Sequence, residues 1–205
     1  MNEFNEADWY SLEQSVKDGN VIPIIGPDAL MVEYKGQTVP FYRLVSADLL
    51  KSFQIEPEAE ILQHTWSLHR AVSVILIKKG SPRIEQGIRR EVSRLVAHYS
   101  DLVQPAESLR LLAGIRAFTL FVSLTPDNLL ERVMQTADPS STIRTSTYSP
   151  RDASESLSDL LLRQGERGIF QMLGSCTQIG SGFAIHEEDT LEHLYRLQSD
   201  GTRRL

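Results

Sequence analysis

The chain has 205 residues, of which 41% are hydrophobic and 23% are charged, values that are typical of a folded domain and exclude a disordered chain. Its net charge of −6 disfavours direct binding to nucleic acid, because the phosphate backbone requires a basic surface. The single cysteine, Cys176, excludes a disulfide framework, and the acidic N-terminus has no apolar signal segment, which together indicate a cytoplasmic protein. The longest apolar run, Val72–Ile77, is too short to cross a membrane.

The N-terminal region predicts a helix followed by a strand. Asn5 can cap the helix and Gly19 can end it. The apolar run Val21–Ile25 predicts a short strand that is buried on both faces. Pro23 weakens the prediction of this strand, because proline cannot donate a hydrogen bond to a neighbouring strand.

Residues 42 to 115 are predicted to be helical, since their apolar residues recur at helical spacing. Glu58–Lys79 predicts one long helix that ends at Gly80. The Ser-Pro pair that follows can begin the next helix, and Pro105 begins a short one.

Helix and strand patterns also alternate in the second half of the chain. The predicted strands are Thr119–Ser123, Ile169–Leu173 and Phe183–Ile185. The predicted helices are Leu129–Met134, Ser156–Arg163 and Glu187–Gln198, and the Ser- and Thr-rich segment Asp138–Ser149 is predicted as a loop or an edge strand.

This alternation favours the α/β class, with a parallel sheet and a helical insertion at about residues 42–115. We expect one domain over residues 1–198. Residues 199–205 lack a core pattern and are expected to form a mobile tail, or a linker to a further C-terminal region.

Two predicted strands are followed by residues that suit a binding site. Gly26 and Asp28 follow the first strand, but a dinucleotide fingerprint needs further glycines, so on this motif alone an ordinary turn at the strand end is the better explanation. Thr125 and Asp127 follow the strand Thr119–Ser123, where open α/β sheets bind ligands. They also suit the start of a helix, and both interpretations remain open.

Gly174 and Ser175 follow a third strand and can line a cleft or turn the chain. The histidines have no spacing typical of metal ligands, and Cys176 has no evident catalytic partner. No catalytic residue and no metal site is therefore predicted.

Four segments in this order resemble the sirtuin-like domains of bacterial anti-phage defence proteins, which typically cleave NAD. The segments are NVIPIIGPDAL (residues 20–30), AFTLFVSLTPDNLLERV (117–133), GIFQMLGS (168–175) and FAIHEEDTLEHLYRL (183–197). The resemblance covers nearly all of the chain and implies a Rossmann-like parallel sheet.

The resemblance fails at the residues that perform the family's chemistry. Thr125 stands at the position of the family's Asn, and Leu173 stands at the position of its acid–base His. The family's Gly-Ala-Gly loop is here Gly26, Pro27 and Asp28. A leucine cannot accept a proton, and loss of a general base typically costs about 100- to 10,000-fold in rate.

The resemblance therefore implies a catalytically degenerate module of a defence protein, which acts in oligomerisation, with its own copies or a partner defence protein, or in nucleotide sensing. NAD or ADP-ribose would contact the six candidate residues Gly26, Asp28, Thr125, Asp127, Gly174 and Ser175. One alternative is an active NAD hydrolase that uses His64 or His69 as a relocated base. Another is a purely structural protein–protein module whose cleft is filled by side chains such as Leu173 and Pro27.

Overall fold

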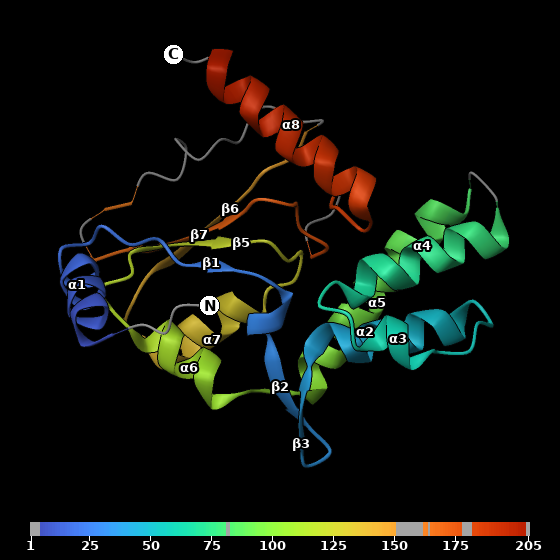
Figure 1. Cartoon of the computed structure of the whole chain (residues 1–205), viewed down its shortest axis with the longest axis horizontal. Helices are drawn as coiled ribbons and strands as arrows, with labels where there is room; N and C mark the ends of the chain where they lie inside the picture. The colour runs from blue at the N-terminus through green and yellow to red at the C-terminus, as the bar shows by residue number, and fades with distance from the viewer. Residues whose placement is uncertain (1–4, 81–82, 151–161, 164, 178–181, 204–205) are drawn as a thin grey trace.

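The computed structural model describes residues 5–80, 83–150, 162–163, 165–177 and 182–203. Its centre is a four-stranded sheet in the order β1-β5-β7-β6, in which every neighbouring pair is parallel. The strands are β1 (Ile24–Ile25), β5 (Leu120–Ser123), β7 (Arg167–Gln171) and β6 (Ile143–Thr147). The predicted α/β class, a Rossmann-like parallel sheet with a helical insertion, is confirmed (Figure 1).

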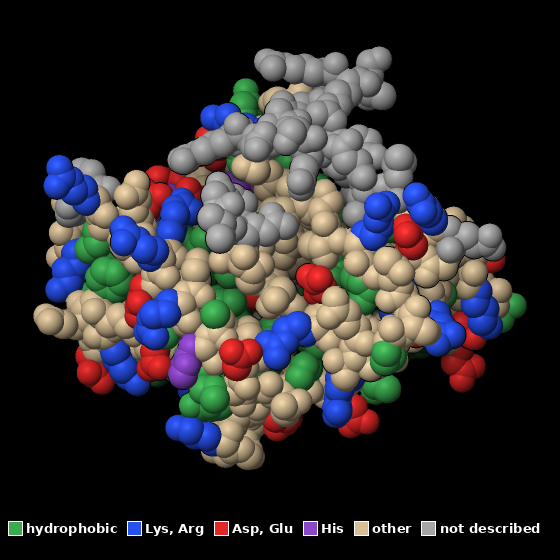
Figure 2. Space-filling view, turned by 180° about the vertical axis from the view of Figure 1, so that it is seen from behind, with side chains coloured by type: hydrophobic (Ala, Val, Ile, Leu, Met, Phe, Trp, Pro, Cys, Tyr) green, Lys and Arg blue, Asp and Glu red, His purple; other side chains and the backbone are tan. Residues whose placement is uncertain are grey.

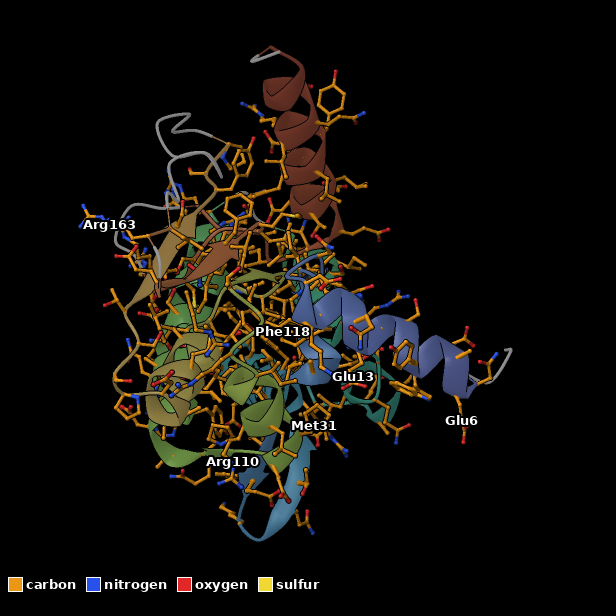
Figure 3. The ribbon with its side chains drawn as sticks, turned by 90° about the vertical axis from the view of Figure 1, so that its left-hand side faces the viewer. Glu6, Glu13, Met31, Arg110, Phe118 and Arg163 are labelled. Carbon is orange, nitrogen blue, oxygen red and sulfur yellow. The ribbon has the colours of Figure 1, made fainter. Side chains whose placement is uncertain are left out.

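Helices cover both faces of this sheet (Figure 1). Phe121 and Ile169 point to one face, where they join the main core with α6 (Glu107–Gly114) and α7 (Leu129–Ala137). Their neighbours Val122 and Phe170 point to the opposite face, toward α8 (Glu187–Arg203), because successive side chains of a strand alternate. The helix α1 (Glu6–Lys17) lies at the margin, and Figure 3 shows it extending away from the sheet at Glu6.

The insertion adds a small antiparallel sheet and a cluster of helices. The sheet has the order β3-β2-β4, from β2 (Met31–Tyr34), β3 (Gln37–Pro40) and β4 (Gln104–Pro105). The helices are α2 (Phe41–Ser52), α3 (Ala59–Leu62), α4 (Ser67–Lys79) and α5 (Ile84–Leu102). These helices lie beside the parallel sheet rather than on it (Figure 1).

Several predicted boundaries are confirmed by the local chemistry. Asn5 caps α1 in a capping box, in which its side chain and that of Asp8 each accept a backbone N–H. Gly80 ends α4 in the left-handed conformation, with a φ of 54°. The segment predicted as a loop or an edge strand forms β6, at one edge of the parallel sheet. In the described ranges, no helix has the length and apolar character needed to cross a membrane.

Other predictions are wrong. The first strand is not buried on both faces, because β1 is an edge strand of two residues and Ile24 is 64% exposed. Phe183–Ile185 is not a strand, and only Phe183 forms an isolated bridge, with Gly174. Glu58–Lys79 is interrupted at residues 63–66, where His64 Nδ1 accepts the backbone N–H of Trp66.

Two further predictions concern the C-terminal part. The predicted end of the last helix at Gln198 is wrong, because α8 continues to Arg203. The helix predicted at Ser156–Arg163 falls almost entirely outside the described residues.

Candidate functional site

The parallel sheet brings the three predicted segments together at the carboxyl ends of its strands. The backbone N–H of Leu124, after β5, donates to Ile25 of β1 at 2.9 Å. The N–H of Met172, after β7, donates to Ser123 of β5 at 3.0 Å, and the N–H of Cys176 donates to Pro126 at 2.8 Å. The six candidate residues therefore belong to one end of the sheet, where α/β proteins bind ligands.

The carboxylate of Asp127 accepts hydrogen bonds from groups within the protein. Its Oδ1 accepts the backbone N–H of Leu129 at 2.9 Å, at the start of α7, and its Oδ2 accepts the hydroxyl of Tyr42 at 2.6 Å. The residue is only 4% exposed, and burial raises the pKa of its carboxyl despite these hydrogen bonds. Asp127 therefore bonds to the first N–H of α7, whose N-cap residue is Asn128 and not Thr125, and both of its carboxylate oxygens already have donors.

Thr125 is also buried and satisfied by its own loop. Its hydroxyl lies 3.0 Å from Ser123 Oγ, and its backbone N–H donates to the same oxygen at 3.2 Å. Gln171 fixes the loop further, since its Nε2 donates to the carbonyl of Asp127 at 2.8 Å. This network ties the loop after β5 to the protein's own side chains.

Gly174 accommodates the protein's own backbone. Its φ is +84°, and a Cβ at this position would lie 2.2 Å from Gly182 O and 2.6 Å from Phe183 Cα. Leu173 is 3% exposed and its carbonyl accepts the N–H of Ala184 at 2.9 Å, so residues 182–184 run directly against this turn. The close approach that a glycine permits is therefore taken by residues 182–183.

Ser175 and the loop after β1 complete the set. Ser175 is fully buried, and its Oγ lies 3.0 Å from Thr177 Oγ1. Gly26 has an extended backbone, with a φ of −96°, that any residue can adopt, and it precedes a short 3-10 turn at Pro27–Ala29. Asp28 is exposed, so Gly26 and Asp28 are the more accessible part of the candidate set.

Little space remains between these loops. The cavity that Pro27, Thr125 and His69 share has a volume of about 10 Å³. A cavity of this size holds about one water molecule. The side chains that line it are mostly apolar, and Pro27 is buried.

The histidines proposed as a relocated base differ in their surroundings. His69 lines the small cavity beside Thr125 and also a cavity of about 340 Å³ between α4 and α8, and its ring lies 4.8 Å from that of Trp66. Burial, followed by the nearby His186, lowers the pKa of His69 to about 4, so the ring is neutral at pH 7. His64 is exposed and lines only the larger of these two cavities.

Sequence reasoning missed the charged cluster that joins the insertion to α8. The guanidinium of Arg89 lies 2.7 Å from carboxylate oxygens of both Glu85 and Asp189, and it donates to the carbonyl of Phe183. Glu85, His186 and Asp189 place metal-type donor atoms within 4.8 Å of one another, but Arg89 already supplies a positive charge there. The four-residue spacing of Glu85 and Arg89 was the available signal, whereas Asp189 lies 100 residues away from Arg89.

Cys176 is not placed for nucleophilic chemistry. Burial, together with the charge of Asp127, raises the pKa of its thiol well above the ordinary value, so the thiolate is not populated near neutral pH.

The fold and the geometry at the strand ends define an α/β protein with a Rossmann-like parallel sheet and a helical insertion. No protein-family model matches the chain, and no curated protein matches it.

Proposed function

We propose that this chain is a catalytically degenerate, sirtuin-like module of a bacterial defence protein, and that it works through assembly with its own copies or with a partner protein. The observation that carries the proposal is the contact at Gly174. The backbone of residues 182–183 fills the space against this turn, and Leu173 is buried where the family holds its acid–base His.

The electrostatics at the strand ends support the same proposal. Cleavage of NAD needs a group that accepts a proton and donors that face the substrate. Leu173 offers no such group, and the hydroxyl of Thr125 is engaged with Ser123. Both oxygens of Asp127 are hydrogen-bonded to the protein, which leaves none of them aimed at a ribose.

Exposed apolar side chains on two helices support a role in assembly. Trp9 and Tyr10 are exposed on α1, and Leu191 and Tyr195 are exposed on α8. Single exposed apolar residues are common, whereas a contiguous apolar patch marks a contact surface, so each pair supports assembly to the extent that its side chains adjoin. The mass of the chain in solution, measured by light scattering, reports the assembly directly.

The use of the cleft is tested with Gly26→Leu. A Cβ added at Gly26 meets no atom within 4 Å, and the extended backbone there accepts any residue, so we expect the variant to fold. It would obstruct a nucleotide placed against the loop after β1. We expect Gly26→Leu to leave the affinity for NAD and for ADP-ribose unchanged in isothermal titration. A loss of affinity of tenfold or more would instead support nucleotide sensing through this loop.

A second candidate is an NAD hydrolase that uses His69, which lines the same small cavity as Thr125. A neutral His69 can accept a proton, although a pKa of about 4 makes it a weak base at pH 7. This route predicts that the chain releases nicotinamide from NAD and that His69→Ala reduces the rate by about 100-fold or more. His98→Ala, on α5 away from that cavity, is the matched control. Equal rates in both variants would eliminate the route.

A further inference from the structure

A second concave site lies outside the strand ends, in the insertion. It is a cavity of about 570 Å³ between the β2–β3 hairpin and the helices α2 and α5, which we call the hairpin pocket. Its volume falls within the usual range of about 300–1,000 Å³ for small-molecule sites. Val39 and Leu44 contribute apolar surface to its lining.

The hairpin pocket is positively charged, although the chain as a whole has a net charge of −6. Lys35, Arg43 and Lys51 line it, and Asp48 is the acidic residue among its lining side chains. Asp48 stays ionised but is paired with Lys51 and accepts a hydrogen bond from the hydroxyl of Tyr99, so the excess positive charge of the pocket comes from Lys35 and Arg43. Burial alone would raise the pKa of Asp48, but these two hydrogen bonds outweigh it and lower the pKa.

Arg43 is the side chain best suited to bind a ligand. It is exposed and has no hydrogen bond or ion pair within the described part of the chain, whereas Lys51 is partly engaged by Asp48. A free guanidinium presents a fixed fork of donors that matches the oxygens of a phosphate group. The ammonium groups of Lys35 and Lys51 can add charge without demanding a fixed direction.

Aromatic rings stand beside these charges. Tyr34 and Tyr99 line the hairpin pocket and contact each other edge to face, with ring centroids 5.7 Å apart. Lys35 Nζ lies 5.0 Å from the centroid of the Tyr34 ring. Rings that already pack edge to face can extend the packing to a further flat ring. The pocket therefore combines anion-binding groups with a surface suited to an aromatic ligand.

We propose that the hairpin pocket binds a phosphorylated small molecule that carries a flat ring and has about the size of a nucleoside monophosphate. Arg43 binds the phosphate group, Lys35 and Lys51 contribute attraction, and Tyr34, which is the more exposed of the two tyrosines, contacts the ring. The site lies in the insertion and does not depend on the loops at the ends of the parallel strands.

The test is isothermal titration of the full chain with AMP, inorganic phosphate and adenosine. AMP should bind more tightly than phosphate, and adenosine, which lacks the anion, should bind weakest. Removal of one charge-assisted contact costs about 1.5–3 kcal/mol, so Arg43→Gln should weaken AMP binding by about tenfold or more. The matched control is Arg110→Gln, on α6 at the other side of the hairpin, where Figure 3 labels the residue.

Three results would overturn the proposal. They are no detectable binding of AMP to the wild-type chain, equal AMP affinity in the wild type and in Arg43→Gln, and equal affinity for AMP and phosphate. The variant Gly26→Leu separates this site from the strand ends. A loss of AMP affinity in Gly26→Leu but not in Arg43→Gln would place the ligand at the sheet, contradict the hairpin pocket and also count against the proposed function.

Discussion

Gly174→Ala is expected to lower the free energy of unfolding by about 3–5 kcal/mol. Alanine is strained in the left-handed backbone conformation of this position, and its Cβ would also overlap neighbouring atoms. The φ of Gly174 is +84°, and the new Cβ would lie 2.2 Å from the carbonyl oxygen of Gly182. This oxygen and the nearby Cα of Phe183 cannot move easily, because both are backbone atoms. Chemical denaturation of the two proteins measures the difference.

Gly36→Ala is the matched control for this variant. Gly36 has a similar φ of +78°, but a Cβ there meets no atom within 4 Å. Its cost is therefore the conformational part alone, about 1–2 kcal/mol. If Gly174→Ala costs no more than Gly36→Ala, residues 182–183 do not pack against Gly174, and the cleft would be open to a ligand.

Asp127→Ala is expected to lower the free energy of unfolding by about 2–4 kcal/mol, because a hydrogen bond at the start of α7 is lost and a buried hydroxyl loses its acceptor. The hydroxyl is that of Tyr42, and the lost hydrogen bond is the one from the N–H of Leu129. Asp127→Asn keeps the size and one acceptor oxygen, and should cost less. Equal stability of Asp127→Ala and the wild type would show that the carboxylate is not held inside the protein.

The same site predicts a pH dependence. Burial raises the pKa of Asp127 in the folded protein above that in the unfolded chain. The folded state therefore retains the proton of Asp127 to higher pH than the unfolded chain does. The resulting contribution to the free energy of unfolding is fully present below the ordinary pKa of an Asp carboxyl. It is lost as the pH rises through the folded pKa. Relative to Asp127→Asn, the wild type should thus lose stability as the pH increases above about 4. Denaturation curves at several pH values measure this, and a constant difference would mean a solvated carboxyl.

Local chemistry made part of the fold predictable. The cap at Asn5 and the end of α4 at Gly80 follow from neighbouring residues, and the buried strand β5 follows from a short apolar run. The β2–β3 hairpin was not predicted, because its turn pairs Gly36 with Lys35, which adopts a positive φ of 51° without being a usual turn residue. The extent of β1 was misjudged, since an apolar run does not reveal that its strand lies at a sheet edge.

The sequence predicts where the candidate site lies, but not which contacts its residues make inside the protein. Parallel strands bring their carboxyl ends together, so the loops holding Gly26, Thr125 and Gly174 had to meet. The partner of Asp127 is Tyr42, 85 residues away in the sequence, and no spacing rule connects them. A glycine after a strand also looks the same whether a ligand or the chain itself fills the space beside it.

The distribution of charge over the surface was also not predictable from the sequence. The face seen in Figure 2 carries acidic and basic side chains interspersed with one another. The net charge of −6 therefore does not describe individual surfaces, such as the hairpin pocket with its three basic residues. Only the fold places Lys35, Arg43 and Lys51 around one cavity, since Lys35 comes from the hairpin and the other two lie about two turns apart on α2.

The most direct test of the central claim is release of nicotinamide from NAD by the purified chain, followed over hours at high protein concentration. The proposed degenerate site predicts no release above that of a buffer blank, because Leu173 and Thr125 stand at the positions to which the resemblance assigns the catalytic His and Asn. Release that scales with protein concentration would contradict the account. Its dependence on His69 would then show whether a relocated base performs the reaction.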